Sequence, residues 1–203
     1  MSDRRRCVTI GITGASGALY AVRTVAALLA AEVRVELVVS EFGRRLLRDE
    51  LGANAAAERL GRYVSERYGV SAPDDRLVLH SNKDVGATIA SGSYPCDAMV
   101  IVPCSMKTLA GVAHGLSRNL IERAADVALK ERRRLLIVPR ETPMSLPQLR
   151  NMALCAEAGA QVIPAMPAFY QHPETIDDLA DFMAGKILSC LNLEHELYPI
   201  WTG

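Results

Sequence analysis

The stretch GITGASGALY, residues 11–20, decides the fold that this chain can adopt. It places three glycines, a threonine and a serine between an apolar run rich in β-branched residues and a segment with helical apolar spacing. The apolar run predicts a buried strand over residues 7–13, and the spacing after it predicts a helix over Ala18–Ala30. A glycine turn between a strand and a helix is typical of the first βα unit of a parallel sheet, where backbone N–H groups at the helix start can hold an anion.

The same alternation of strand and helix continues to the end of the chain. Further strands are predicted at residues 33–40, 77–80, 97–104, 134–140 and 160–165. Further helices are predicted near residues 42–51, 53–68, 106–113, 117–133, 147–159 and 177–191. Apolar strands that alternate with helices predict an α/β protein whose parallel sheet carries helices on both faces, of the Rossmann-like or flavodoxin-like kind. Since no linker, repeat or low-complexity segment interrupts the pattern, we expect residues 1–203 to form a single domain.

The composition excludes several classes of protein. The 203 residues include 23 basic and 23 acidic side chains, which leaves no basic footprint for nucleic acid or an anionic membrane. No apolar stretch is long enough to cross a bilayer. The cysteines form no CxxC pair and no zinc-binding spacing, which is typical of reduced, mostly buried thiols; they are Cys7, Cys96, Cys104, Cys155 and Cys190. We therefore expect a cytoplasmic protein that binds neither nucleic acid nor membrane.

The unusual polar motifs of the sequence directly follow predicted strands. They are TGASG, SEF, PCSMKT, PRETP and PAMPAFY, each at the end of a different strand. In an open α/β sheet, ligands bind at the carboxyl ends of the strands. The loops at the opposite edge are plainer, so the motifs predict a binding site at the carboxyl edge.

The glycine turn does not match two well-known phosphate-binding motifs. A P-loop needs lysine and a hydroxyl residue after its last glycine, but Ala18 and Leu19 stand there. The dinucleotide fingerprint needs G-x-G-x-x-G, whereas these glycines are three residues apart. It also needs an acid at the end of the second strand, which ends in Ser40 with Glu41 beside it. A cradle for another phosphate or cofactor and a plain tight turn both remain open at this point.

Two other motifs favour an anionic ligand. Lys107 stands in the first turn of a predicted helix that Ser105 and Thr108 can cap, although a cation is disfavoured at a helix N-terminus. An anionic ligand would remove that conflict. Arg140 and Glu141 follow an apolar strand and precede a proline, which also favours a functional role.

A third pair of cations lies on one predicted helix. Arg123 and Lys130 are seven residues apart and therefore share one helical face, two turns from each other. A role in ligand binding and a role as surface charges are equally compatible with this spacing.

Taken together, these motifs resemble the UbiX-type flavin prenyltransferases. The resemblance rests on GITGASGALYAVR (11–23), SGS (91–93), the long stretch from PCSMKT to RETPMS (103–145) and PAMPAFYQHP (164–173), which occur in order across nearly the whole chain. Related flavin-dependent cysteine decarboxylases have a PASANT-like stretch where this chain has PCSMKT. They also have a catalytic histidine in their first half, where this chain has only His80. The resemblance is therefore to the prenyltransferase branch.

The resemblance implies a defined reaction. Enzymes of this family join a dimethylallyl group from dimethylallyl phosphate to N5 and C6 of reduced FMN, and the prenylated FMN serves UbiD-type decarboxylases. The family forms large homo-oligomers with the flavin between subunits. We expect a reaction without metal, because the only candidates for an Asp-rich magnesium motif, Asp74-Asp75 and Asp177-Asp178, stand in a turn and at a helix start.

The resemblance also implies the site residues. FMN contacts are expected at Gly14, Ala15, Ser16, Ser40, Ser105, Met106, Lys107, Thr108, Arg123 and Arg140. The prenyl phosphate is expected at Lys130, Arg140, Glu141, Tyr170, Lys186 and Trp201. Catalytic roles are expected for Ser16, Glu50, Lys130 and Glu141.

These residue types suit the departure of a phosphate from an allylic carbon. Cations can stabilise the charge that develops on the leaving group, and Glu141 can protonate it. Ser16 can help to manage the proton at N5. The family usually has arginine at the position of Lys186, and lysine keeps the charge without the planar fork, so the grip on phosphate is expected to be weaker.

Two alternatives remain at this point. The chain can be a flavoprotein decarboxylase that acts directly on an acid, without a prenyl donor. It can also be a non-catalytic FMN carrier associated with an aromatic acid decarboxylase. The sequence leaves open the number of subunits, the decarboxylase pathway that receives the product, and the preference for a monophosphate or a diphosphate donor.

Overall fold

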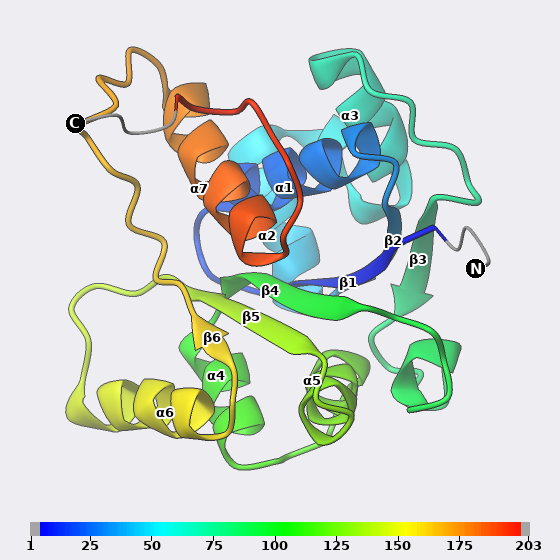
Figure 1. Ribbon diagram of the computed structural model, residues 1–203, viewed down its shortest axis with the longest axis vertical. Helices are drawn as coiled ribbons and strands as arrows, with labels where there is room; N and C mark the ends of the chain where they lie inside the picture. Colours follow the sequence, from blue (N-terminus) through cyan, green and yellow to red (C-terminus); the bar gives the residue numbers. More distant parts are fainter. Residues whose placement is uncertain (1–4, 200–203) are drawn as a thin grey trace.

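The computed structural model describes residues 5–199, and within them one six-stranded parallel sheet forms the centre of the molecule (Figure 1). The strands are β1 (Cys7–Ile12), β2 (Arg34–Val39), β3 (Leu77–Ser81), β4 (Ala98–Cys104), β5 (Arg134–Pro139) and β6 (Gln161–Val162). Their order across the sheet is β3-β2-β1-β4-β5-β6. Neighbouring strands pair in parallel, for example Val8 of β1 with Val35 of β2 and with Ala98 of β4.

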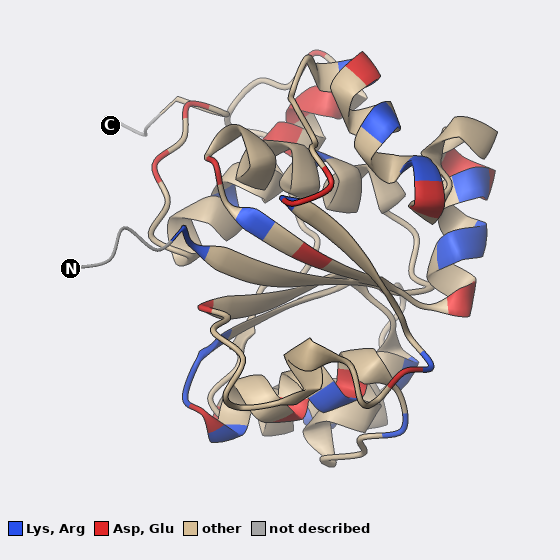
Figure 2. Cartoon of the chain, turned by 90° about the vertical axis from the view of Figure 1, so that its right-hand side faces the viewer, with Lys and Arg blue, Asp and Glu red and all other residues tan. Residues whose placement is uncertain are grey.

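Helices cover both faces of this sheet (Figure 1). One face carries α1 (Ala18–Ala30), α2 (Glu41–Leu51), α3 (Leu60–Tyr68) and α7 (Ile176–Cys190). The other face carries α4 (Met106–Ala113), α5 (Leu120–Lys130) and α6 (Leu146–Glu157). Figure 2 shows the sheet edge-on between the two helical layers, with most charged residues on helices and loops.

The apolar strands of the sequence are buried on both of their faces. Every residue of β1 and of β4 is buried, because helices pack on either side of these central strands. One apolar cluster joins α1, α3 and α7 to the sheet, and a second joins α4, α5 and α6 to its other face. The predicted α/β fold with helices on both faces is therefore confirmed. The strand order is that of the Rossmann-like fold, not of the flavodoxin-like one.

The segment over residues 53–68, which we predicted as one helix, is divided in the structure. Two short 3₁₀ turns, Ala53–Ala55 and Ala57–Arg59, precede α3. Extended backbone at Ala56, with ψ 144°, separates the two turns. Helical spacing of apolar residues does not record such a break, because alanine fits a helix and a turn equally well.

Two other elements are shorter than predicted. The helix predicted over residues 117–133 begins at Leu120, because the side chain of Asn119 accepts a hydrogen bond from the backbone of Glu122 and caps the first turn. The last strand pairs only at Gln161–Val162. Pro164 follows two residues later and has no N–H to extend the ladder.

Candidate active site

The loops that follow β1 and β4 are joined by one buried side chain. The hydroxyl of Thr13 donates a hydrogen bond to the carbonyl of Pro103 at 2.8 Å and accepts one from the backbone N–H of Ser105 at 2.7 Å. The strand order reverses between β1 and β4, since β2 and β3 continue to one side and β5 and β6 to the other. Open α/β sheets bind their ligands at this point of reversal.

A cavity of about 320 Å³ opens at this edge of the sheet. Five of the residues that we predicted to contact FMN line it, and these are Gly14, Ser40, Ser105, Lys107 and Thr108. They come from three different segments, the loops that follow β1 and β2 and the loop and helix start that follow β4. The structure thus brings together residues that are almost a hundred positions apart in the sequence.

Gly14 allows a close approach between two walls of this crevice. A Cβ atom added at Gly14 would lie 2.4 Å from the Cβ of Phe42, so no larger residue fits without a shift of the backbone. The side chain of Phe42 lines the crevice and is 65% exposed. It therefore offers an apolar wall opposite the glycine turn.

Hydroxyl side chains begin the two helices that border the crevice. Ser40 caps α2 by accepting from the backbone of Gly43 at 3.0 Å. Ser105 caps α4 by accepting from the backbone of Thr108 at 3.3 Å, and its own hydroxyl donates to that of Thr108 at 3.1 Å. Lys107 is exposed in the first turn of α4 and forms no ion pair with any residue between 5 and 199. A cation and a helix N-terminus thus border the same cavity, an arrangement that suits an anion.

Glu50 occupies the start of α1. One of its oxygens accepts hydrogen bonds from the backbone of Gly17 at 3.0 Å and of Ala18 at 2.8 Å. Gly17 makes this possible because it has a φ of 117°, in the left-handed region that favours glycine. Burial, with a further contribution from the Glu50 carboxylate, raises the pKa of Tyr20 above its ordinary value. The first helix therefore has its N-terminus satisfied by a carboxylate from within the chain.

The loop after β5 meets the glycine turn. Arg140 donates through Nε to the carbonyl of Ser16 at 3.2 Å, so a cation lies against the loop that we expect to hold FMN. Glu141 accepts a hydrogen bond from the backbone of Thr142 at 2.9 Å. Ser16 itself is exposed, whereas Ala15 is buried.

Lys130 lies apart from this group. Its ammonium is 2.5 Å from the carboxylate of Glu131, and it also lies beside Gly92, which precedes β4. Lys130 ends α5 shortly before β5 begins, which places it at the amino edge of the sheet. Since the six residues of β5 span about 20 Å, Lys130 and the crevice of the same chain are on opposite edges.

The other predicted site residues also lie outside the crevice lining. Arg123 pairs with Asp126 at 2.8 Å on α5. Tyr170 is half exposed and contacts Phe182 edge-to-face, with 6.2 Å between the ring centroids. Lys186 is exposed on α7. Met106 is partly buried against the apolar cluster that joins α4, α5 and α6 to the sheet. Trp201 lies outside the described residues.

The predicted site residues did not include Thr13, nor six residues that line the cavity, namely Glu41, Phe42, Asn82, Asn119, Ile121 and Glu122. Thr13 joins the two loops, Phe42 forms a wall, and Asn82 lines the cavity while its Oδ1 accepts from the backbone at the start of α5. Asn82 was detectable, because it follows the third strand as the other polar motifs follow theirs. Thr13 and Phe42 stand within the motifs TGASG and SEF, which predicted the site, but their individual roles depend on contacts with other segments of the chain.

Two searches of the described residues give negative results. Between residues 5 and 199, no group of three or more His, Cys, Asp or Glu side chains is arranged to hold a metal ion. In the same range, every helix is too short or too polar to cross a bilayer.

A Rossmann-like sheet with a polar crevice at its point of reversal defines the general class of a mononucleotide-binding protein. The sequence profile described as "Flavoprotein" matches residues 1–188. The chain is also 47% identical over 193 residues to the flavin prenyltransferase UbiX of Halalkalibacterium halodurans, an alignment that covers 95% of this chain and 92% of that protein. The chain belongs to the UbiX-type flavin prenyltransferases of the Flavoprotein family.

Two solved structures are similar over nearly their full length. AnUbiX (PadA1), in complex with FMN and dimethylallyl pyrophosphate, has a TM-score of 0.88 and 37% identity, with 98% of this chain and 99% of that chain covered. A dodecameric FMN-dependent Ubix-like decarboxylase from Escherichia coli O157:H7 has a TM-score of 0.86 and 38% identity, with 97% and 100% covered. FMN as the bound flavin and assembly into a homo-oligomer are thus supported by close structural relatives.

Proposed function

We propose that this flavin prenyltransferase joins the dimethylallyl group of dimethylallyl phosphate to N5 and C6 of reduced FMN. The observation that carries the proposal is the crevice between β1 and β4, where a glycine turn, three hydroxyls and Lys107 converge, together with the carboxylates of Glu41 and Glu122. The relative solved with FMN and dimethylallyl pyrophosphate supports the same two kinds of ligand. The product, prenylated FMN, is proposed to serve UbiD-type decarboxylases.

The chemistry of the crevice fits FMN. Lys107 and the N-terminus of α4 offer positive charge to the phosphate, and the hydroxyls of Ser40 and Thr108 offer hydrogen bonds. Phe42 offers an apolar face to the flavin ring. We assign the FMN contacts to Gly14, Ala15, Ser16, Ser40, Ser105, Met106, Lys107, Thr108, Arg123 and Arg140. When bound, reduced FMN supplies the nucleophilic N5 and C6 atoms.

The residues around the prenyl donor manage charge and protons. The charge of the leaving phosphate is balanced by three cations, Arg140, Lys130 and Lys186. This electrostatic stabilisation is strongest where water is excluded. Tyr170 offers a hydroxyl to the same phosphate, and Glu141 gives it a proton. Ser16 and Glu50, at the glycine turn and at the start of the helix after it, help to manage the proton at N5. No step in this scheme requires a metal ion.

A complete site needs more than one subunit in this proposal. Lys130 lies on the sheet edge opposite the crevice, so the crevice receives its lysine from a neighbouring chain. Three leucines of α6 are exposed and would be covered by such a neighbour, namely Leu146 at 57%, Leu149 at 47% and Leu154 at 37%. The dodecameric relative supports an assembly of this kind. Trp201 is proposed as a further residue of the donor site.

Two broader assignments belong to the same proposal. We place the protein in the cytoplasm, which agrees with five cysteines that are all reduced thiols. We also treat residues 1–203 as one FMN-binding domain, since a single sheet joins the first and the last described strands and the family profile covers residues 1–188.

The donor site is tested with Lys186→Ala. Loss of a cation that holds the prenyl phosphate is expected to raise the KM for dimethylallyl phosphate about tenfold or more, with a smaller effect on FMN binding. Steady-state kinetics at varied donor concentration measure this. Arg62→Ala is the matched control, because Arg62 is an exposed cation on α3 that pairs only with Glu66 among the described residues. An unchanged KM in Lys186→Ala would remove Lys186 from the site.

A further inference from the structure

Two thiols lie together at the amino edge of the sheet, opposite the flavin crevice. The Sγ atoms of Cys7, at the start of β1, and Cys96, just before β4, are 3.7 Å apart. The hydroxyl of Thr9 lies 3.2 Å from the Sγ of Cys96. No step of the proposed prenyl transfer uses either thiol.

The backbone at these cysteines suits a covalent link. β1 and β4 are adjacent and parallel, with Val8 opposite Ala98, and the backbone of Asp97 donates to the carbonyl of Cys7 at 2.9 Å. Cys96 is therefore one position away from the residue directly opposite Cys7. A strand spacing of about 4.8 Å and a rise of about 3.3 Å place such a diagonal pair ~5.8 Å apart at Cα, which is within the range of disulfides.

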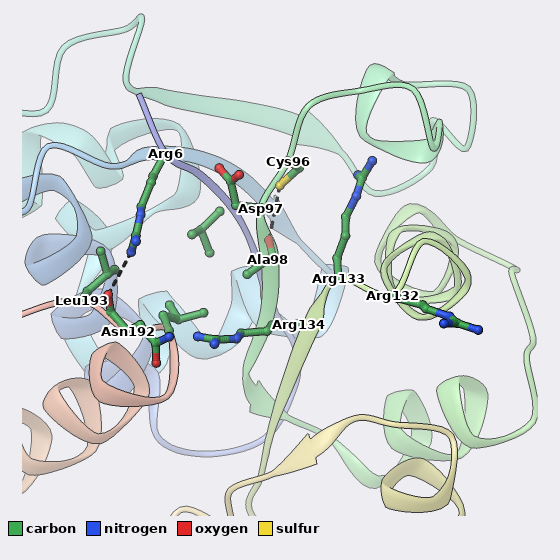
Figure 3. A pocket seen from close by; sticks show the side chains of 11 residues that line it. Arg6, Cys96, Asp97, Ala98, Arg132, Arg133, Arg134, Asn192 and Leu193 are labelled. Atoms are coloured by element: carbon green, nitrogen blue, oxygen red, sulfur yellow. Dashed lines mark hydrogen bonds between the residues drawn. The ribbon is translucent and has the colours of Figure 1, made fainter. Parts of the chain in front are cut away.

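One of the two thiols is open to a cavity with positive charge. A cavity of about 450 Å³ is lined by Cys96 together with Arg6, Arg133 and Arg134. Figure 3 shows Arg6 directed to the carbonyl of Asn192, and Cys96 with its sulfur directed to the carbonyl of Ala98. Arg134 donates to the carbonyl of Cys190. Cys7 is only 4% exposed. A small oxidant therefore reaches Cys96 before it reaches Cys7.

The surroundings also divide the roles of the two sulfurs. Hydrogen bonds from Cys7 and Thr9 lower the pKa of Cys96 below its ordinary value, although burial opposes this. The same sulfur contact, together with burial, raises the pKa of Cys7. Burial likewise raises the pKa of Cys104 and of Cys155, which makes those thiols poor nucleophiles. A reactive thiol in a positively charged cavity beside a second thiol is the arrangement of redox-responsive cysteine pairs.

We infer that Cys96 and Cys7 form a reversible disulfide when the protein meets hydrogen peroxide. The thiolate of Cys96 attacks one oxygen of hydrogen peroxide, the O–O bond breaks, and a sulfenic acid forms, while the hydroxide that leaves takes up the proton that Cys96 had released and becomes water. The thiol of Cys7 then attacks the sulfenic sulfur, the S–O bond breaks, and the S–S bond forms. The hydroxyl leaves as water with the proton of Cys7. Two thiols are oxidised and one peroxide is reduced to two waters.

The link would tie β1 to the segment that leads into β4. That segment includes Tyr94, whose hydroxyl donates to the buried carboxylate of Glu36, and Gly92, whose carbonyl accepts from Arg133. Because the link closes a long stretch of chain, it restricts the unfolded state, so the oxidised protein is expected to melt at a higher temperature than the reduced one.

The test uses the whole protein and dilute hydrogen peroxide. Alkylation of the unfolded chain is expected to count five thiols before treatment and three after it, with full recovery in dithiothreitol. Trypsin releases residues 7–23 and 84–107 as one linked pair, and fragmentation places the link at Cys96 and not at Cys104. Five thiols after treatment, or a link to another cysteine or to a second chain, would overturn the inference.

Variants separate the two roles. Cys96→Ser is expected to keep the remaining thiols reduced, and Cys7→Ser is expected to accumulate a sulfenic acid at residue 96 that dimedone traps. Cys190→Ser is the matched control, because Cys190 is also partly exposed but lies beside Gln161, and it should form the disulfide as the natural chain does. A Cys7→Ser protein with no dimedone adduct overturns the assigned order of attack. Circular dichroism verifies that each variant is folded. If a variant does not fold, the thiol count of the natural chain before and after peroxide decides whether the disulfide forms.

Discussion

The carboxylate of Glu36 is a buried charge on β2 of the sheet. This side chain is fully buried on β2 and lies 2.6 Å from Nε2 of His80 and 2.6 Å from Nε of Arg34. Tyr94 donates its hydroxyl to the same carboxylate. Burial alone would raise the pKa of Glu36, but the hydrogen bonds from His80, Tyr94 and Arg34 outweigh it and lower the pKa from 4.5 to about 2. Glu36 is therefore ionised in the folded protein at neutral pH.

The lowered pKa makes part of the stability depend on pH. Because the folded pKa is below the unfolded one, Glu36 stabilises the fold above about pH 4.5, and this contribution is lost as the pH falls towards 2. Glu36→Gln is expected to lower the free energy of unfolding by about 3 kcal/mol at pH 7, since it leaves buried partners of a charge unsatisfied. The deficit is expected to be smaller at pH 3. Urea denaturation at both pH values measures it.

A matched variant separates this cluster from ordinary surface charge. Glu66→Gln removes a carboxylate that pairs with Arg62 on the exposed side of α3, so stability should hardly change at either pH. Equal losses in Glu36→Gln and Glu66→Gln would contradict the account of the buried cluster.

Single residues also show the reach of sequence reasoning. The glycine turn indicated a close approach, and Gly14 does face Phe42, but the sequence could not name the partner because Phe42 is in another element. The resemblance selected Glu50 as a site residue. Its capping of α1 was not predictable, because the two segments are joined only by long-range folding, 33 positions apart.

At the scale of elements, Thr13 is the contact that joins the two sides of the crevice. Its hydroxyl is bonded on both sides, to Pro103 and to Ser105, and is 1% exposed. Thr13→Val keeps the shape but leaves the N–H of Ser105 without a partner, which is expected to cost about 1–3 kcal/mol. We also expect weaker FMN binding, because the start of α4 is no longer fixed against β1. Flavin fluorescence titration and urea denaturation measure the two effects.

The control for this variant is Thr24→Val. Thr24 is equally buried, but its hydroxyl donates only to the carbonyl of Tyr20 within α1, so flavin affinity should not change. If Thr13→Val loses stability but keeps its FMN affinity, the hydrogen bonds of Thr13 stabilise the fold without positioning the FMN site, which would contradict this account.

Strands and helices with strong periodicity were predictable, and their pairing was predictable in part. The apolar runs of β1 and β4 are buried along their whole length, as parallel strands between two helical layers must be. The division of residues 53–68 was not predictable, because it depends on the backbone at Ala56 and not on side-chain type. Helix ends were predictable where a capping residue was present. The start of α5 was not, because Asn119 and not Ser117 caps this helix, and the contact of Leu120 with Asn82 that fixes this start is a tertiary one.

At the scale of the whole molecule, the predicted donor site is divided between distant places. Arg140 meets the glycine turn at the carboxyl edge, whereas Lys130 pairs with Glu131 at the amino edge. A sequence gives spacing along one chain and no information on which copy of the chain supplies a residue. The separation of Lys130 from the crevice is visible only in the folded molecule.

Mixed oligomers test this division. Lys130→Ala and Glu141→Gln are each expected to be inactive when expressed alone. Co-expressed, they are expected to recover up to about a quarter of the natural activity, since random assembly reunites two intact halves in that share of sites. Prenylation rates of separately tagged and jointly purified oligomers measure the recovery. A mixture as inactive as its parents would place both residues in the same subunit's site.

The central claim, that this chain prenylates FMN, is tested most directly by weighing the flavin. The purified protein is incubated without oxygen with reduced FMN and dimethylallyl phosphate, in buffer with a metal chelator, and the extracted flavin is examined by mass spectrometry. The account predicts flavin heavier by one dimethylallyl unit. Unmodified flavin, with both the monophosphate and the diphosphate donor offered, would contradict it and favour a protein that binds FMN without altering it.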